Sequence, residues 1–268
     1  MKINSLGYKT DFIFTRYDGS VVEKDKYFVV TTKSNPNFFW GNLLLFKQAP
    51  KQGDFQSWKS LFNKEFKTPK RHHITLAWDT IDGELGDVNE FIEHGFNLDE
   101  SIVLVAKVVE RSKKFNQNVE MKLIDSEDNF QKVIDIQTAC GARHLSKSTW
   151  YSFYKTQMDQ YKKLIKLDKG KWFGAFLNNE LVGSLGIFVE DNVARYQIVS
   201  TSPKFQRQGV CNTLVYKSAK YALENMNVDT LVMVADEHYH AAKIYESVGF
   251  KAMEKQVGVC WYDKSVHK

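Results

Sequence analysis

Apolar residues recur at two spacings along the chain, and segments with one spacing alternate with segments with the other. Short runs that are alternating or continuously apolar, bounded by turn-forming residues, predict strands. Segments with apolar residues three and four positions apart predict helices. The clearest helix begins at Asp54, a good N-cap, and carries Trp58, Leu61, Phe62 and Phe66 on one face. The alternation of the two patterns predicts an α/β (α+β) protein.

The first half of the chain ends in a polar stretch that has no periodicity, Glu110–Gln117. Before it, the pattern predicts strands at Phe12–Thr15, Tyr27–Thr32, Gly41–Phe46, His73–Trp78 and Ser101–Val109, and helices at Asp54–Phe66 and Asp87–Glu93. We interpret the polar stretch as a junction. This interpretation predicts two domains, at residues 1–112 and 118–268.

The second half shows the same alternation. Strands are predicted at Val119–Leu123, Trp172–Leu177, Leu181–Val189, Ala194–Thr201, Leu231–Ala235 and Gln256–Tyr262, and helices at 126–140, Lys147–Lys166, 209–225 and Tyr239–Val248. The pair Asn178 and Asn179 suits a hairpin turn, because such a turn needs left-handed backbone.

A short pattern occurs once in each half. Residues 91–96 and 245–250 both end in Gly-Phe, and each follows an apolar strand that ends near an acid, Asp79 or Asp236. This echo predicts a divergent internal duplication. Chance recurrence of a strand–helix–Gly–strand unit is the alternative.

Composition narrows the class of protein. Hydrophobic residues make up 43% and charged residues 26% of the chain, as in ordinary globular domains. No apolar run is long enough for a bilayer and no apolar leader follows Met1, so we expect no membrane partner and a cytoplasmic location. Three scattered cysteines predict neither a disulfide framework nor a metal site. A net charge of +5 is weak evidence for nucleic-acid binding, which we do not expect.

The loop before the predicted helix at 209–225 carries the strongest chemical signal. It reads Ser202-Pro203-Lys204-Phe205-Gln206-Arg207-Gln208-Gly209-Val210-Cys211-Asn212. Backbone N–H groups in such a loop can bind an anion at the positive end of the helix dipole. Gly209 leaves room for a pyrophosphate close to the backbone, and Arg207 adds positive charge.

This loop resembles the acyl-CoA signature of the GNAT superfamily of N-acetyltransferases: Gln or Arg, two residues, Gly, one residue, then Gly or Ala. Gln206 and Gly209 match, and Cys211 replaces the small residue. Ala241, Tyr245 and the pair Gly249-Phe250 match a second family motif downstream.

The resemblance covers about residues 120–261, including a hairpin at 172–183 that fits the family's second and third strands. It implies a mixed, mostly antiparallel twisted sheet flanked by helices. Together with the internal echo, it predicts tandem GNAT-like domains.

The resemblance also implies roles for individual residues, with acetyl-CoA as co-substrate and no metal. The coenzyme-binding residues would be Val199, Ser200, Thr201, Gln206, Arg207, Gln208, Gly209, Val210, Cys211, Asn212 and His238, the last standing where the family often has an asparagine. Tyr245 would be the catalytic acid that protonates the departing thiolate, because a reference pKa of about 10 keeps tyrosine protonated at neutral pH. A tyrosine that only packs on its helix is the alternative.

No general base is evident. Many relatives carry a glutamate on the central strand, but residues 197–202 here contain no carboxylate. Glu237 or His238 could act through water, and a surface position for both is the alternative. Cys211 is interpreted either as a redox-sensitive thiol or as a small buried residue.

The first half lacks the chemistry of the second. Phe91 falls where Tyr245 falls when the two Gly-Phe pairs are superposed. In the loop before the helix at 54–66, Pro50 removes a backbone donor and Asp54 brings negative charge. We therefore expect a degenerate GNAT-like domain at 1–112 that does not hold coenzyme A.

Two hypotheses of function remain. The first is an N-acetyltransferase that moves an acetyl group directly from acetyl-CoA to an amine of a small molecule or peptide, with transfer of a longer acyl or an aminoacyl group as a variant. The second is a non-catalytic acyl-CoA-binding or sensor protein, which the missing glutamate motivates. We expect a monomer or homodimer in either case.

Overall fold

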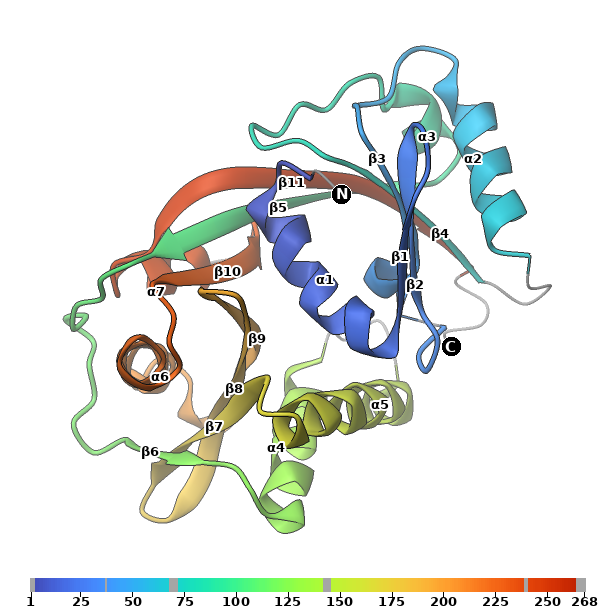
Figure 1. The fold of residues 1–268 in the computed structure, drawn as a ribbon. Helices are drawn as coiled ribbons and strands as arrows, with labels where there is room; N and C mark the ends of the chain where they lie inside the picture. The colour runs from blue at the N-terminus through green and yellow to red at the C-terminus, as the bar shows by residue number, and fades with distance from the viewer. Residues whose placement is uncertain (1–2, 37, 68–71, 142–145, 239–240, 264–268) are drawn as a thin grey trace. The chain divides into compact units, whose positions relative to one another are not determined.

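Figure 1 shows the computed structural model, which describes residues 3–36, 38–67, 72–141, 146–238 and 241–263. Its α-helices are α1 (Leu6–Asp18), α2 (Asp54–Glu65), α3 (Asn89–Glu93), α4 (Glu127–Cys140), α5 (Lys147–Lys166), α6 (Val210–Asn225) and α7 (Ala241–Glu246). Its strands are β1 (Gly19–Glu23), β2 (Tyr27–Thr32), β3 (Leu43–Phe46), β4 (His73–Trp78), β5 (Asn97–Ala106), β6 (Glu120–Leu123), β7 (Gly170–Leu177), β8 (Glu180–Glu190), β9 (Val193–Thr201), β10 (Thr230–Asp236) and β11 (Lys251–Tyr262). Two short 3-10 helices are η1 (Phe39–Gly41) and η2 (Pro203–Phe205).

The chain divides into two compact units. The first contains Met1–Val103, Ala235–His238 and Met253–Lys268, and the second contains Leu104–Val234 and Tyr239–Ala252. Most of β11 therefore packs in the first unit, although it follows the second unit in sequence. The boundaries expected from sequence, 1–112 and 118–268, stay a prediction, because compactness does not mark where a duplicated segment begins.

The sheet of the first unit has the strand order β1-β2-β3-β4-β11-β5. The pairs β1–β2, β2–β3 and β4–β11 are antiparallel. The pair β3–β4 is parallel, and α2 forms the crossover between its two strands. Parallel neighbours need such a crossover, which sets the position of the loop that precedes α2.

Helices cover both faces of this first sheet. Successive residues of a strand point to opposite faces. Accordingly, Leu43 and Leu45 of β3 share a core with Phe12 of α1, whereas Leu44 shares a core with Trp58 of α2. All five side chains are almost fully buried, so β3 is a central strand of the unit.

The sheet of the second unit has the strand order β10-β9-β8-β7-β6. Its pairs are antiparallel except β9–β10. On β7, Trp172 meets Tyr161 of α5 with ring centroids 5.3 Å apart, and the next residue, Phe173, meets Tyr221 of α6 at 5.2 Å. Helices α5 and α6 therefore cover opposite faces, with α4 beside α5 (Figure 1).

One strand predicted from sequence is wrong, because Phe12–Thr15 lies inside α1. Ser5 caps this helix by accepting a hydrogen bond from the backbone N–H of Tyr8 at 3.3 Å. A four-residue apolar run fits a strand or a helix equally well. The Ser5 cap lies outside this apolar run, and it favours the helix over the strand. Strand β1, which follows α1, has no fully buried residue and therefore no pattern that sequence could detect.

The other predicted elements are confirmed, with shifts at their ends. Lys147–Lys166 has the predicted bounds, whereas β11 begins at Lys251 and α7 ends at Glu246. The first two residues of the last predicted helix, 239 and 240, lie outside the described residues. The fold is an α+β one, with mixed, mostly antiparallel sheets and flanking helices. No helix in the described ranges is long and apolar enough to cross a membrane.

Candidate active site

A large cavity opens in the second unit. Its volume is about 1070 Å³. Its wall is formed by the linker residues 110–114, the end of β9 (199–201), the turn 205–207, the start of α6 (209–212) and residues of α7. Most residues that the sequence marked for coenzyme binding, together with Tyr245, therefore surround one space.

Strands β9 and β10 separate at this cavity. Their parallel pairing joins Val193–Arg195 of β9 to Thr230–Val232 of β10 and goes no further. Strand β9 continues to Thr201, and its last three residues line the cavity. The sheet thus opens a slot between two neighbouring strands, where an extended chain can lie against strand backbone.

Strand β9 also carries a bulge near the slot. Gly186 of β8 pairs with Gln197 and Ser184 pairs with Ser200, so β9 uses one residue more than β8 over this interval. Within the bulge, Ile198 has a φ of 42°, which is rare for a β-branched residue. Bulges re-aim backbone groups next to active sites, and such strain persists where the surroundings enforce it. Sequence reasoning missed this feature, because isoleucine does not signal left-handed backbone.

Helix α6 presents unpaired donors to the cavity. Gly209 precedes it in left-handed conformation, with φ 75°, and no side chain caps the helix. The backbone N–H groups of Val210, Cys211 and Asn212 donate to no acceptor in the part of the chain that the structure describes. The first turn of a helix leaves these groups free, and the helix dipole makes the site favourable for an anion.

The linker before β6 lies against this same turn. A Cβ at Gly209 would stand 2.0 Å from the carbonyl oxygen of Lys114. Asn116 donates its side-chain amide to the carbonyl of Gln208 and its backbone N–H to the Thr213 hydroxyl, both at 2.8 Å. The sequence explains Gly209 by the space that a pyrophosphate needs. The structure adds a second cause, a close approach of the protein's own backbone, which no local sequence signal reveals.

Tyr245 lies in the cavity wall and is 6% exposed. A polar network holds the end of its helix. The Asn212 amide donates to the hydroxyls of Ser247 (2.9 Å) and Ser112 (3.2 Å), and these two hydroxyls are 3.1 Å apart. The network ties the first turn of α6 to the linker and to the turn after α7. It therefore fixes the helix that positions Tyr245.

The two cysteines of the wall both have raised pKa values. Loss of solvation raises the pKa of Cys211 to about 12. Loss of solvation also raises the pKa of Cys140, whose thiol donates to the carbonyl of Thr201 at 3.2 Å. Because the thiolate is the reactive form, these shifts favour the packing interpretation of Cys211 over the redox one.

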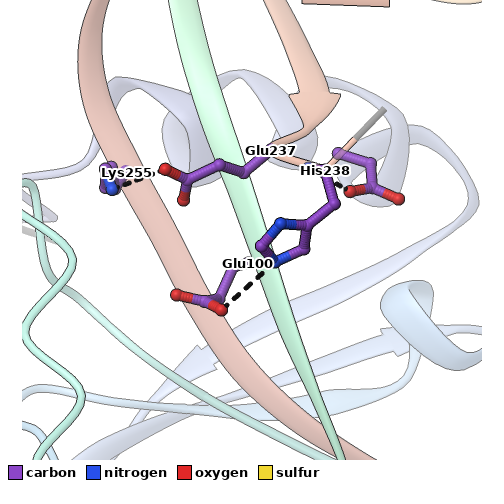
Figure 2. Close-up of polar contacts among 5 residues, drawn as sticks. Glu100, Glu237, His238 and Lys255 are labelled. Atoms are coloured by element: carbon purple, nitrogen blue, oxygen red, sulfur yellow. Dashed lines mark hydrogen bonds and ion pairs between the residues drawn. The ribbon is translucent and has the colours of Figure 1, made fainter. Parts of the chain in front are cut away.

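Two predicted residues are not part of the cavity wall. Gln208 is one, although its neighbours on both sides line it. His238 is the other, and its imidazole Nε2 lies 3.4 Å from the Glu100 carboxylate, with the side chain 75% exposed (Figure 2). Glu237 pairs with Lys255 at 2.6 Å. The coenzyme contacts of Gln208 and His238 stay predictions.

Neither candidate base expected from sequence therefore lies in the wall. Among the described residues that line the cavity, Glu110 is the only carboxylate, and it is exposed. No group of three or more His, Cys, Asp or Glu in the described ranges is arranged to hold a metal ion.

Residues 139–250 match the sequence profile of the Acetyltransferase (GNAT) family. This segment is a GNAT acetyltransferase domain. It contains the bulged strand, the turn before α6 and α7, and it leaves out the linker. The chain matches no protein among those with curated descriptions.

Solved structures share the fold of the GNAT domain and of much of the remaining chain. A conserved protein of unknown function from Staphylococcus epidermidis ATCC 12228 is 17% identical, with a TM-score of 0.75, over 92% of this chain and 95% of that one. A GCN5-related N-acetyltransferase from Kribbella flavida is 12% identical, with a TM-score of 0.64, over 96% of both chains. A tandem GNAT protein from the clavulanic acid biosynthesis pathway is 11% identical, with a TM-score of 0.55, over 82% of this chain and 73% of that one. At these identities the likeness concerns the fold.

Acyl-CoA, the co-substrate typical of GNAT proteins, suits the residues present in the GNAT domain. The slot between β9 and β10 can take an extended arm, and the unpaired N–H groups of α6 can take a phosphate. Five cationic side chains share the wall with one carboxylate; the cations are Arg111, Lys113, Lys114, Arg207 and Lys243. The cavity is therefore matched to an anionic ligand.

Proposed function

We propose that the protein is an N-acetyltransferase that moves an acetyl group directly from acetyl-CoA to an amine of a small molecule or peptide. The observation that carries the proposal is the slot between β9 and β10 beside the uncapped start of α6. A GNAT domain that keeps both features has the two parts that a long phosphorylated thioester requires, a trough for its arm and a site for its phosphates.

The residues predicted from sequence fall into two groups, which we assign to two different parts of the coenzyme. Val199, Ser200 and Thr201 line the slot and are assigned to the pantetheine arm. The turn from Gln206 to Asn212 is assigned to the pyrophosphate, through main-chain N–H groups. Acetyl-CoA supplies an activated thioester that the amine can attack directly, so no covalent nucleophile of the protein is required.

Tyr245 is the residue of the wall best suited to act as the acid. Its hydroxyl belongs to a buried side chain on a helix that the Asn212 network holds in place. A tyrosine is protonated at neutral pH and can donate a proton to a departing thiolate. Such a donor typically contributes about 10²–10⁴-fold to the rate.

Deprotonation of the amine is assigned to water rather than to a side chain. The end of β9 carries no carboxylate, and Glu110 is exposed. An amine with a pKa of about 10 is mostly charged at neutral pH. We therefore expect the rate to rise with pH through the range in which the free amine becomes abundant.

The first unit fits a degenerate GNAT-like domain in its topology. Its crossover from β3 through α2 to β4 joins two parallel strands, as the crossover from β9 through α6 to β10 does in the GNAT domain. Gly53 precedes α2 with φ 85°, as Gly209 precedes α6 with φ 75°. The tandem fold of the clavulanic acid pathway protein supports the same arrangement.

The first unit also fits a domain that does not hold coenzyme A. Strand β3 stays paired with β4 to its last residue, Phe46 opposite Trp78, so no slot opens. Aromatic rings occupy this end of the crossover, where Phe46 stacks on Trp58 with centroids 3.5 Å apart. Phe91, in the place of Tyr245, is fully buried in the same core. The cavity before α2 measures about 250 Å³, a quarter of the other.

The test is an acetylation assay on the full chain with acetyl-CoA and a panel of amines. The panel covers polyamines, amino sugars, amino acids and peptides with a free lysine or N-terminus. We expect thiol release that depends on one amine class, with the acetylated amine identified by mass spectrometry. Absence of acetyl-CoA binding in a calorimetric titration would reject the proposal.

A non-catalytic acyl-CoA sensor is the second candidate, and the shortage of carboxylates in the cavity wall favours it. It makes a different prediction in the same experiment. A sensor binds acetyl-CoA and releases no thiol with any amine class, whereas the transferase does both.

A further inference from the structure

The linker between β5 and β6 contributes to the cavity although it lies outside the matched GNAT segment. Residues 110–114 all line the cavity, and the family match begins at residue 139. Three of these five residues are cationic: Arg111, Lys113 and Lys114. The family signature therefore accounts for the turn before α6 and leaves this second group of charges unexplained.

The linker is fixed on the start of α6 by several independent contacts. The two hydrogen bonds of Asn116 and the approach of the Lys114 carbonyl to Gly209 hold its far end. The bond between Asn212 and Ser112, at 3.2 Å, holds its middle. Its near end is held by the backbone N–H of Glu110, which donates to the carbonyl of Val248 at 3.0 Å. The cations thus stand on a positioned segment.

The three cations have no carboxylate partner in the described part of the chain. Many other lysines of the second unit do have one, such as Lys132 with Asp128 and Lys220 with Glu224. The Arg111 guanidinium lies over the ring of Phe115, 4.9 Å from its centroid. Cations that gather at a cavity without counter-charges raise the local positive potential and favour an anionic ligand.

Coenzyme A carries one more anionic group than the α6 turn accounts for. The N–H groups of Val210, Cys211 and Asn212 form one anion site, which the proposed function assigns to the pyrophosphate. The remaining anion is the 3′-phosphate of the adenosine end, a terminal phosphate with acceptor oxygens that lysine and arginine recognise by charge-assisted hydrogen bonds. The linker cations adjoin the pyrophosphate site through the contact of Lys114 with Gly209.

We propose that Arg111, Lys113 and Lys114 bind the 3′-phosphate of coenzyme A and make the protein selective for coenzyme A over 3′-dephospho-coenzyme A. The inference rests on the proposed function, since it assigns a further part of the same ligand to this chain. It gives the linker a role in choosing the donor, in addition to joining two parts of the chain.

The experiment is a calorimetric titration of the full chain with coenzyme A and, separately, with 3′-dephospho-coenzyme A. We expect the wild type to bind coenzyme A about tenfold or more tightly, as loss of charge-assisted hydrogen bonds predicts. The variant Arg111→Gln/Lys113→Gln/Lys114→Gln should bind the two ligands with equal affinity, because its affinity for coenzyme A falls and that for the dephospho form changes little.

A matched variant controls for net charge. Lys132→Gln/Lys171→Gln/Lys220→Gln removes the same charge from the same unit, at positions outside the cavity wall. It should keep the wild-type preference. The double variant Lys113→Gln/Lys114→Gln leaves the ring contact of Arg111 intact and should show a partial loss if the triple variant is unstable.

The outcomes separate this inference from the proposed function. Equal wild-type affinity for the two ligands would overturn the role of the linker and leave the transferase assignment standing. An equal loss of preference in the matched control would also overturn it, because the effect would then come from net charge. A wild type that binds neither ligand would remove the proposed function and this inference together.

Discussion

Gly53 and Gly209 adopt nearly the same backbone conformation at the same point of two strand–helix crossovers, with φ 85° and ψ 0° before α2 and φ 75° and ψ 5° before α6. Their surroundings differ. A Cβ at Gly53 would meet nothing within 4 Å, whereas one at Gly209 would stand 2.0 Å from the Lys114 carbonyl oxygen. Comparing the two glycines therefore separates the energetic cost of left-handed backbone from the cost of a steric contact.

Substituting alanine at each position should separate the two effects in stability. Gly53→Ala should lower the free energy of unfolding by about 1 kcal/mol, the cost of left-handed backbone for a residue with a Cβ. Gly209→Ala should cost about 3 kcal/mol, because a steric contact adds to that strain. Urea denaturation measures the free energy of unfolding of both variants. Equal losses would show that the linker backbone moves away from the added methyl group at little energetic cost.

The same two variants should differ in ligand binding. Gly53→Ala should leave the affinity for coenzyme A unchanged, because the first unit has no slot between β3 and β4. Gly209→Ala should weaken it through displacement of the turn before α6. A large loss of affinity in Gly53→Ala would instead show that the first unit takes part in binding.

Replacing Tyr245 by phenylalanine should slow turnover without loosening the coenzyme. The ring keeps its packing and the hydroxyl alone is lost, so kcat should fall about 10²-fold or more while the dissociation constant for acetyl-CoA stays within about twofold. Tyr221→Phe, in α6 against Phe173 of β7 and outside the cavity wall, is the control and should behave as wild type. Wild-type turnover in Tyr245→Phe would eliminate the acid role.

Cys211 should resist alkylation despite its place at the start of a helix. Loss of solvation raises the pKa of this half-buried thiol to about 12, so its thiolate fraction at pH 8 is far below that of an ordinary cysteine. Iodoacetamide labelling followed by mass spectrometry should show modification far slower than that of glutathione, and rapid modification after denaturation. Labelling of the folded protein at the glutathione rate would restore the redox interpretation.

Asp99 should make the protein less stable as the pH rises. Although the Asp99 side chain is exposed, partial loss of solvation around its carboxyl group, followed by the nearby Asp236 carboxylate, raises its pKa to about 6 in the folded state. Between the unfolded pKa of about 4 and this value, the folded state binds more protons, so the free energy of unfolding falls with increasing pH. Asp99→Asn removes this dependence.

Compared with wild type, Asp99→Asn should be more stable above about pH 6 and equally stable near about pH 4. Denaturation curves across this range test the sign. A variant that is less stable than wild type at neutral pH would show that the carboxylate is stabilised in the folded state.

Sequence alone could predict the elements whose signals are local. The bounds of α5 follow from its apolar periodicity and the Ser146 cap, and the hairpin between β7 and β8 follows from Asn178 and Asn179, both of which have positive φ. The turn before α6 follows from Gly209. Each of these depends on residues within one turn or one strand.

The features that sequence could not supply depend on contacts between distant segments. The bulge at Ile198 is set by the register of β9 on β8. Glycine is required at position 209 partly because the backbone of a linker almost a hundred residues away packs against it. Sequence could not predict that the linker forms part of the cavity wall, because its polar composition is equally typical of a segment that only joins two domains. The helix over Phe12–Thr15 was missed because its cap lies outside the apolar run.

The pairing of β11 with β4 has a consequence for how the protein is made. Residues 257–262 complete the hydrogen bonding of a sheet whose other strands are synthesised far earlier. During synthesis, β4 therefore has no strand to pair with along one side until the GNAT domain has been translated. Severing the gene between the two halves would leave that strand permanently open to other chains.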